Sequence, residues 1–224
     1  MWPFAALWGI AAGLVMVFWI GTQIDSPSYA ASWYRDFVNL NGEGNLPAWY
    51  SSTLWLIAAA LAWLTGRAER RYGRSARLAL YWFALGAGCV LLSLDESASI
   101  HEGLGALIDH RTGNPEGYAP VYSWVWLAIG VVALAFAVFI PFLLALPKAT
   151  AIGLLVSGGV FLSGAMGMET IGSLVEYGTL TQWPLGLSWN REFVAEEFLE
   201  MSGVILLAAT IRWHLHVIAK PTEA

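Results

Sequence analysis

The sequence is poor in cysteine and in charge, and both shortages narrow the class of protein. Cys89 is the only cysteine, so no disulfide can form within the chain. Charged residues are 12% of the 224 residues, whereas apolar residues are 58%. This balance is typical of a polytopic helical membrane protein and leaves no room for a separate soluble domain. We therefore expect one transmembrane helical domain over residues 1–224, with membrane lipids and not nucleic acid as its partners.

The motifs of several well-known catalytic sites are absent from the sequence. There is no His-Glu-x-x-His zinc motif, no Gly-x-Ser-x-Gly turn around a nucleophilic serine and no phosphate-binding P-loop. The two Glu-x-x-His pairs of helical di-iron proteins are also missing. An ordinary di-iron centre and the enzyme classes that use these motifs are therefore not expected.

Six apolar runs are long enough to cross a membrane as helices. They cover roughly residues 2–24, 48–66, 78–100, 123–146, 150–176 and 190–213. The first run has no basic segment before it and no small-residue cleavage site, so we expect a retained helix and not a signal peptide. Tyr29, Trp33, Phe37 and Leu40 recur at helical spacing and predict a short interfacial helix in the first outer loop. The expected fold is an all-α bundle of six transmembrane helices with this additional helix.

Basic residues are divided unequally between the two sides of this bundle. The loop at residues 67–77 contains five arginines, and Lys148, Arg212 and Lys220 fall on the same side. The opposite side has only three basic residues. Because short cytoplasmic loops are enriched in Lys and Arg, this bias places the loop and both termini in the cytoplasm. We expect a multi-pass protein of the bacterial cytoplasmic (inner) membrane.

Acidic residues show the opposite division. On this topology only Glu69 and Glu223 are cytoplasmic, and the other fourteen of the 16 carboxylates lie outside or in the outer leaflet. Many of them crowd onto three spans, in the strings LSLDESASIHE and REFVAEEFLEM and in the pair Glu169 and Glu176. An Asp or Glu near hydrocarbon costs about 3 kcal/mol, so such residues are usually kept for ion binding, proton transfer or catalysis.

Helical spacing, at about 100° per residue, indicates which of these carboxylates share a face. The three faces are Asp95, Ser99 and Glu102 with Glu96 at the margin; Glu169 and Glu176; and Glu192, Glu196 and Glu200 with Glu197 on the flank. Three helices therefore present carboxylates at similar depth. Where such like charges meet, they need a cation or protons to remain together.

Histidine and serine residues near the acidic string of the third span add two hypotheses. On an ideal helix His101 points away from the Asp95 face, so it joins the carboxylates only if the helix breaks near Ser97 to Ser99. Ser97 lies one turn before His101, a spacing that permits a nucleophilic serine as a minor alternative. The other histidines, His110, His214 and His216, are expected to have no role in the site.

A carboxylate-rich site with one histidine is typical of a divalent cation such as calcium, manganese, magnesium, iron or zinc. The expected ligands are Asp95, Glu96, His101, Glu102, Glu169, Glu196 and Glu200, and the additional candidates are Glu176, Glu197, Ser97 and Ser99. Helix-terminal charge or hydrogen bonding is the structural alternative for each of the carboxylates. Glu43, Glu176 and Glu192 fit simple solvation at the interface, and no residue is assigned a catalytic role.

Three motifs, NLPAWYSS, LSLDESASIHE and EEFLEMSG, lie before or within three of the expected spans. They resemble a family of uncharacterised bacterial multi-pass membrane proteins, and the resemblance covers most of the chain. It implies the membrane fold and transfers no activity. The Ser, Asp and His pattern is also loosely similar to membrane zinc hydrolases of the alkaline ceramidase type. Those enzymes use three His ligands, and here only His101 is suitably placed.

Three classes of function remain open. The leading hypothesis is a metal-dependent membrane hydrolase or oxidoreductase that acts at the outer (periplasmic) leaflet on a lipid-like or quinone-like substrate, because the acidic site has apolar surroundings. The first alternative is a cation- or proton-coupled transporter or channel, since an acidic vestibule attracts cations and Glu200 is its deepest group. The second alternative is a non-catalytic subunit of a larger membrane complex, with other membrane proteins as partners.

Overall fold

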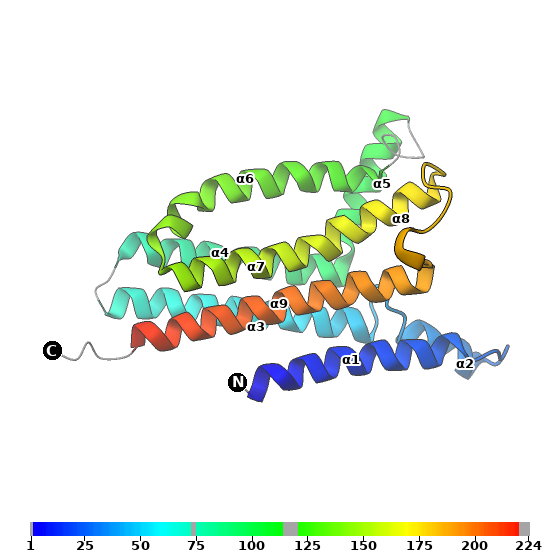
Figure 1. The fold of residues 1–224 in the computed structure, drawn as a ribbon, viewed down its shortest axis with the longest axis horizontal. Helices are drawn as coiled ribbons and strands as arrows, with labels where there is room; N and C mark the ends of the chain where they lie inside the picture. The colour runs from blue at the N-terminus through cyan, green and yellow to red at the C-terminus, as the bar shows by residue number, and fades with distance from the viewer. Residues whose placement is uncertain (1, 73–74, 114–120, 220–224) are drawn as a thin grey trace.

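The chain folds as a bundle of helices. The computed structural model describes residues 2–72, 75–113 and 121–219, and every regular element in these ranges is a helix (Figure 1). The elements are α1 (Trp2–Thr22), α2 (Tyr29–Phe37), α3 (Leu46–Arg71), α4 (Ala76–Ala98), α5 (Ile100–Thr112), α6 (Ser123–Ala145), α7 (Lys148–Leu162), η1 (Ser163–Met168), α8 (Glu169–Glu176), η2 (Pro184–Gly186) and α9 (Trp189–Ala219). The all-α expectation is confirmed for these ranges, and Arg74, Lys220 and Glu223 lie outside them.

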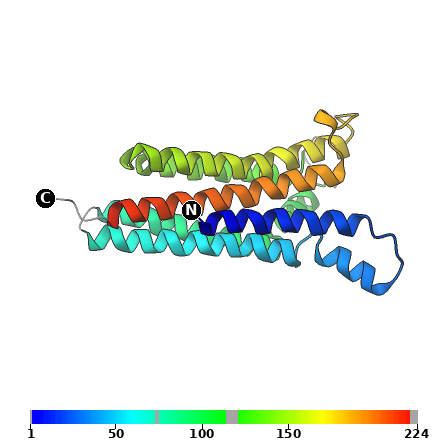
Figure 2. The same ribbon diagram turned by 60° about the horizontal axis from the view of Figure 1, so that its bottom comes forward.

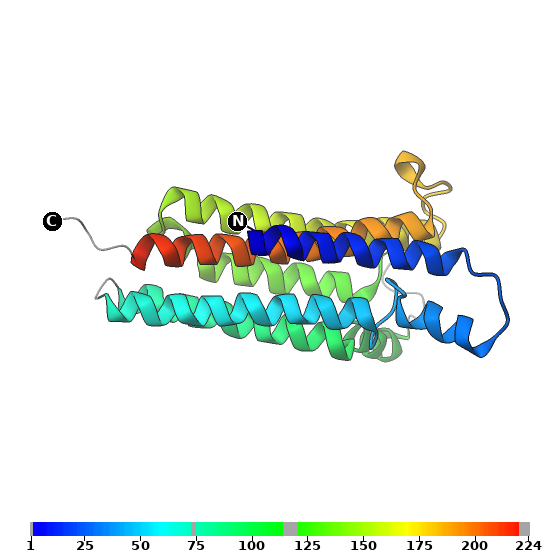
Figure 3. The same ribbon diagram turned by 90° about the horizontal axis from the view of Figure 1, so that it is seen from below.

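Within the described ranges, five helical segments are long and apolar enough to cross a membrane. They are α1 from Phe4 onward, α3, α4, α6 and the continuous segment Lys148–Glu176, which comprises α7, η1 and α8. The sixth expected span corresponds to α9, which packs lengthwise against α3 and α7 but is not among these five (Figures 1 and 3). Its first half carries the acidic string from Glu192 to Glu200. A sixth span therefore stays a prediction.

The short helix expected in the first outer loop is present as α2. Ser28 caps its start, because the hydroxyl accepts a backbone N–H of the first turn at 3.3 Å. The rings of Trp33 and Phe37 stack with centroids 5.0 Å apart, and the Tyr34 hydroxyl donates to the Val17 carbonyl oxygen of α1. Figure 2 shows α2 at the end of the bundle where α1 ends and α3 begins.

α9 packs against α1, α3 and α7 and supplies much of the core. Its fully buried apolar side chains include Met201, Val204, Ile205 and Ile211. The contact with α7 depends on glycine: a Cβ on Gly203 would lie 2.6 Å from the Phe161 backbone nitrogen, and one on Gly153 would lie 2.7 Å from Thr210 Cγ2. Small residues of this kind let apolar helices approach closely. The tight packing fixes the relative position of α7 and α9.

One wide turn interrupts the segment that begins with α7. η1 is a π-helical turn, which holds one more residue than an α-helical turn. Gly164 in this turn packs directly on α9, where a Cβ would lie 2.6 Å from the Glu196 carbonyl oxygen. α8 then starts at Glu169, with its first carboxylate close to the acidic residues of α9.

A break at a single residue separates α4 from α5. Ser99 has φ 47° and ψ 44°, a left-handed conformation that is uncommon outside glycine. Its N–H donates to Glu43 Oε2 at 2.7 Å, and the N–H of His101 donates to Asp95 Oδ1 at 2.9 Å. These carboxylates satisfy backbone donors at the start of α5 that have no helical acceptor. The break meets the condition under which His101 can join the acidic residues.

α6 is covered less than the other long helices. It packs against α5 and α4, and its buried side chains are Ser123, Val125 and Phe142. Leu134 and Leu144 are 67% and 82% exposed. So large an apolar surface is typical of a helix that faces lipid or a partner.

Candidate functional site

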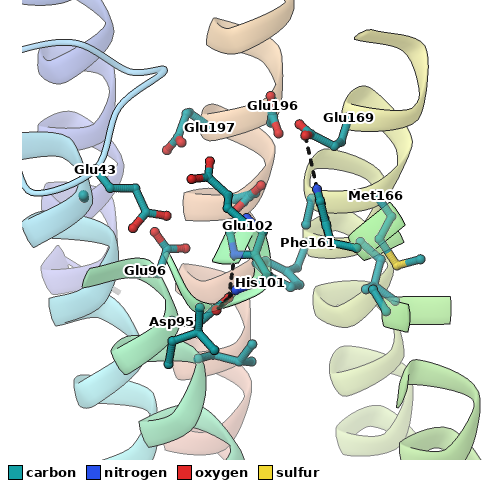
Figure 4. Close-up of a pocket in the computed structure, with 18 of the residues that line it drawn as sticks. Glu43, Asp95, Glu96, His101, Glu102, Phe161, Met166, Glu169, Glu196 and Glu197 are labelled. Carbon is teal, nitrogen blue, oxygen red and sulfur yellow. Dashed lines mark hydrogen bonds and ion pairs between the residues drawn. The ribbon is translucent and has the colours of Figure 1, made fainter. Parts of the chain in front are cut away.

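An acidic cavity of about 350 Å³ lies near the end of the bundle formed by α5, α8 and the start of α3 (Figures 1 and 4). Its acidic and histidine lining is Glu43, Asp95, Glu96, His101, Glu102, Glu169, Glu196, Glu197 and Glu200. All seven residues expected as ligands are among these side chains. The three acidic helix faces therefore border one cavity. Glu43, a loop residue that the sequence did not assign to the site, borders it as well.

The other side of the cavity is apolar. α6 contributes Leu127, Val131 and Val132, and Phe161 and Met166 come from α7 and η1. A volume of this size lies within the range of small-molecule pockets, about 300–1,000 Å³. The cavity thus joins a charged wall to a hydrophobic one.

Asp95 holds His101 at two points. Besides accepting the His101 backbone N–H, its carboxylate places Oδ2 at 2.9 Å from the imidazole Nδ1. An ionised carboxylate only accepts hydrogen bonds, so Nδ1 carries a proton, and in the neutral ring Nε2 keeps its lone pair. The ring packs edge-on against Trp124, with centroids 4.6 Å apart. A carboxylate that orients an imidazole in this way is the usual partner of a metal-binding histidine.

The charges around the ring change its proton affinity. Burial alone would lower the pKa of His101, but the hydrogen bond to Asp95 and the negative charges of Asp95, Glu102 and Glu43 outweigh burial and raise that pKa. Burial also raises the pKa of Glu43, in spite of its hydrogen bonds to Ser99. The raised pKa of His101 reflects an excess of negative charge, which a bound cation would compensate.

Glu43, His101 and Glu102 form a first group of candidate ligands. One ligand atom from each lies within 4.8 Å of the others. The loop that carries Glu43 is organised by Asn45, whose amide donates to two loop carbonyl oxygens at 2.7 and 2.6 Å. Glu43 fitted simple solvation in the sequence, yet here it bonds to the α4–α5 break and lines the cavity.

Glu169, Glu192 and Glu196 form a second group, again with one oxygen from each within 4.8 Å of the others. Glu192 is 1% exposed, so the expectation that it is solvated is wrong. It lies against Gly172 of α8, where a Cβ would be 3.1 Å from Glu192 Oε1. The indole N–H of Trp124 donates to Glu169 Oε1 at 3.4 Å, which links this group to the ring beside His101 (Figure 4).

A smaller cavity of about 280 Å³ borders the second group. Its lining is Asn41, Tyr122, Glu169, Gly172, Glu176, Trp189, Glu192 and Phe193. Glu176 accepts a hydrogen bond from the Tyr122 hydroxyl, and burial together with Glu176 raises the pKa of Tyr122. Glu176 is thus a neighbour of the second group and lies outside the lining of the larger cavity.

The remaining additional candidates have different surroundings. Glu197 lines the larger cavity. The Ser97 hydroxyl donates to Ser52 Oγ at 2.9 Å and to the Ser93 carbonyl oxygen at 3.2 Å, so it joins α4 to α3. In the described part of the chain neither Ser97 nor Ser99 makes a side-chain hydrogen bond to His101. The nucleophilic-serine hypothesis therefore gains no support.

A second carboxylate–histidine pair lies at the opposite end of the bundle. His214 Nε2 lies 3.3 Å from Glu69 Oε1, and His214 Nδ1 lies 2.9 Å from Thr150 Oγ1. The exposed fractions of His214 and Glu69 are 1% and 2%. His214, expected to have no part in the site, indeed lies far from it along α9. It joins α3, α7 and α9 and lines neither cavity.

The part of the chain that the structure describes defines a class: it is all-helical, with five helices long and apolar enough to cross a membrane and an acidic, histidine-containing cavity near one end. Residues 4–215 match the family described as "Domain of unknown function (DUF8692)", so the chain belongs to this family. No curated protein and no solved structure matches the chain. The family agrees with the resemblance to uncharacterised proteins, whereas nothing in the comparisons supports a similarity to alkaline ceramidases.

Proposed function

We propose that the protein is an integral membrane enzyme that holds a divalent metal ion at the outer end of a six-helix bundle and acts on a lipid-like or quinone-like substrate. The observation that carries this proposal is the imidazole of His101. Asp95 engages its Nδ1, and one ring nitrogen lies within 4.8 Å of a carboxylate oxygen of Glu43 and of Glu102 in the same cavity. Because the same cavity has an apolar side, a metal and a hydrophobic substrate can meet in it.

The proposed membrane placement has α9 as the sixth span and the cavity on the outer side of a bacterial cytoplasmic membrane. The distribution of basic residues supports it. Six basic residues lie away from the cavity, at the ends of α3 and α9 and the starts of α4 and α7. They are Arg67, Arg70, Arg71, Arg77, Lys148 and Arg212. Positive charge of this kind favours the cytoplasmic side, which would put both termini there. α2 would then lie on the outer surface.

Glu43, His101 and Glu102 are the proposed metal ligands, and Asp95 is the residue that positions His101. One nitrogen and two carboxylates suit zinc, iron or manganese. When bound, such an ion would activate a water molecule or polarise a substrate oxygen, which serves hydrolysis and oxidation alike. Glu96, Glu197 and Glu200 line the same cavity and belong to neither ligand group, and Glu96, the neighbour of Asp95 in the sequence, is the proposed general base.

α6 supplies the proposed contact with substrate. Leu127, Val131 and Val132 line the cavity, while most other side chains of α6 are exposed and would face lipid. A headgroup fits a volume of about 350 Å³, and its apolar chain would remain against α6. This arrangement favours an amphiphile over a fully water-soluble substrate.

Cation- or proton-coupled transport is the second candidate, and one observation favours it. Glu69 and His214 give the inner half of the bundle a buried pair of ionisable groups. Between this pair and Glu200, α9 buries apolar side chains that include Met201, Val204 and Ile205. Transport would require these side chains to separate. Cation or proton flux in sealed vesicles, absent without the protein, would favour this candidate.

Elemental analysis of protein purified without chelator tests the metal. We expect a divalent transition metal in the wild type, its loss from His101→Ala, and its retention in His110→Ala. His110 is the matched control because it is an exposed histidine of the same helix, α5. Wild-type protein without metal, or His101→Ala with undiminished metal, would overturn the assignment.

Cysteine labelling tests the orientation. Cys89 is 2% exposed and out of reach of a reagent, so the native protein is the background. Leu185→Cys, at a position 99% exposed, should react with an impermeant thiol reagent from outside the cell. Tyr72→Cys, at the end of α3, should react only after the membrane is opened. The reverse pattern would place the cavity in the cytoplasmic half.

A further inference from the structure

We propose that Glu169, Glu192 and Glu196 form a second cation site, separate from the ligands around His101, which takes a hard, oxygen-preferring divalent ion such as calcium or manganese. The proposal adds to the metal site described above and does not depend on it. It stands on the geometry of the three carboxylates, on a buried oxygen that has no partner, and on the absence of a nearby counter-charge among the described residues.

The three carboxylates converge from two helices. Glu192 and Glu196 are four residues apart and share a face of α9, and Glu169 opens α8 opposite that face. One oxygen from each lies within 4.8 Å of the others, the spacing of ligands around a single ion. Figure 4 shows the carboxylates of Glu169 and Glu196 close together on neighbouring helices. Glu169 directly follows the wide turn η1.

Glu192 is the observation that points to a ligand. It is 1% exposed, and its Oε2 has no hydrogen-bond partner among the described residues. The side chain borders the smaller cavity, where Gly172 leaves room for it: a Cβ at this glycine would lie 3.1 Å from Glu192 Oε1. A buried carboxylate oxygen without a partner is unfavourable unless a cation or a proton occupies the adjacent space.

No described basic side chain neutralises the group. Within the described ranges the carboxylates that pair with a basic residue are Asp95 and Glu69, each with a histidine. Arg191 precedes Glu192 in the sequence, but its guanidinium donates to the Gly186 carbonyl oxygen at 2.9 Å and is exposed. Three acidic groups therefore share a small volume without a cationic partner from the chain itself.

The donor set selects the kind of ion. All three ligands are carboxylates, whereas the first group contains an imidazole nitrogen. Calcium takes six to eight oxygen ligands and manganese also accepts carboxylate and water, so an oxygen-only site favours these ions over zinc. The adjacent cavity of about 280 Å³ has room for coordinating water, and Asn41 lines it as a further oxygen donor.

The test is a calcium and manganese titration of the purified protein, followed by thermal melting after treatment with chelator. We expect either ion to raise the melting temperature of the wild type. Glu192→Gln should weaken this response at least tenfold, and Glu192→Asp, which keeps the charge but shortens the side chain, should weaken it as well. Glu176→Gln is the matched control, because Glu176 lines the same cavity but is not one of the three carboxylates. It should titrate as the wild type does.

The competing explanation is that shared protons, and not a cation, hold the three carboxylates together. The same experiment distinguishes the two. If protons occupy the site, neither ion stabilises the wild type and Glu192→Gln melts at an equal or higher temperature, because glutamine resembles the neutral acid. That outcome overturns the proposal. A response that Glu192→Gln and Glu192→Asp both retain in full also overturns it, since the ion then binds elsewhere.

The first metal site and the second cation site fail separately. If Glu192→Gln loses the calcium response but still binds the transition metal, the result supports two separate sites. In His101→Ala we expect the transition metal to be lost and the calcium response to persist. A wild type that holds transition metal but shows no calcium or manganese response overturns only the second site. The opposite result overturns only the metal assigned to His101.

Discussion

The two ends of the bundle contain the same chemical pair, a carboxylate and a histidine beside a tryptophan. Asp95 and His101 lie 2.9 Å apart with side chains 27% and 32% exposed, whereas Glu69 and His214 lie 3.3 Å apart and are each 2% exposed. The decisive difference is the second ring nitrogen. In His214 both ring nitrogens contact a side chain, Glu69 and Thr150, while the ring of His101 is held at Nδ1 and lines the acidic cavity. The same pair is therefore a structural link at one end and a candidate ligand at the other.

The tryptophans beside the two histidines differ in the same way. Trp82 lies 5.0 Å from the His214 ring and Trp124 lies 4.6 Å from the His101 ring, measured between centroids. Trp82 is fully buried in the bundle, but the indole N–H of Trp124 reaches on to Glu169. At the acidic end the aromatic ring thus connects two groups of ionisable residues, and at the other end it only closes the core.

Glu69 and His214 form a sealed pair, since both side chains are buried. Removing one partner of this pair should have the largest effect on stability. His214→Ala leaves Glu69 buried and unpaired, which we expect to lower the free energy of unfolding by about 3–5 kcal/mol. The double variant Glu69→Leu/His214→Leu should recover most of this loss, because no buried charge remains. Denaturant unfolding in detergent measures both, with metal content unchanged. A loss below about 1 kcal/mol would contradict a sealed, structural pair.

Asp95 and His101 form an open pair, because they line the cavity. Neutralising the carboxylate of this pair should act on metal binding instead. Asp95→Asn keeps an acceptor for the His101 N–H but removes the charge that orients the imidazole, so metal affinity should fall about 10–100-fold. Glu69→Gln is the matched control and should leave metal affinity unchanged. Competition with a metal indicator dye measures both. Equal affinities in Asp95→Asn and the wild type would show that Asp95 does not position the ligand.

The break that frees His101 should tolerate glycine better than a branched residue. Ser99 has a positive φ, so Ser99→Val should be less stable than Ser99→Gly by about 1–2 kcal/mol. Glycine should also retain the metal, whereas valine should lose part of it because the start of α5 shifts. Thermal melting with elemental analysis measures the two variants side by side. Equal stability would mean that the left-handed turn at Ser99 is not needed.

Exposed histidines should show the smallest effect. His216 follows the sealed pair on α9, and His110 follows the open pair on α5; both are exposed. Their replacement by alanine should change the free energy of unfolding by less than about 0.5 kcal/mol. A larger change at either position would show that the comparison omits an interaction of that histidine.

Much of this arrangement follows from local sequence rules. Helical spacing alone groups Asp95 with Glu102 and aligns Glu196 with Glu200, and these residues border one cavity. The spacing also predicts that His101 can turn toward Asp95 only if the helix breaks between them, and the structure has this break at Ser99. Period and depth are local properties, so the sequence is sufficient to derive them.

The contacts that were missed are long-range. Glu43 reaches the cavity because its loop folds over Ser99, 56 positions later, and Glu69 meets His214 across 145 positions. Glu192 lies one turn beyond the predicted ligands and was assigned to the interface by depth, but α8 buries it. Helical spacing places Glu192 on the face of Glu196 and Glu200, but it does not predict the contacts across the fold, since loop closure and helix–helix packing decide them.

The π-helical turn η1 has a consequence for chain length. With i→i+5 hydrogen bonds it stores one residue more than an α-helical turn, so the flanking helices α7 and α8 keep their faces although an extra residue lies between them. Deleting one residue within 163–168 should therefore restore a regular helix and leave Glu169 facing α9. Deleting one residue within α8, where no such reserve exists, would rotate everything after it by about 100°. A single-residue deletion at η1 is thus compatible with Glu169 still facing α9.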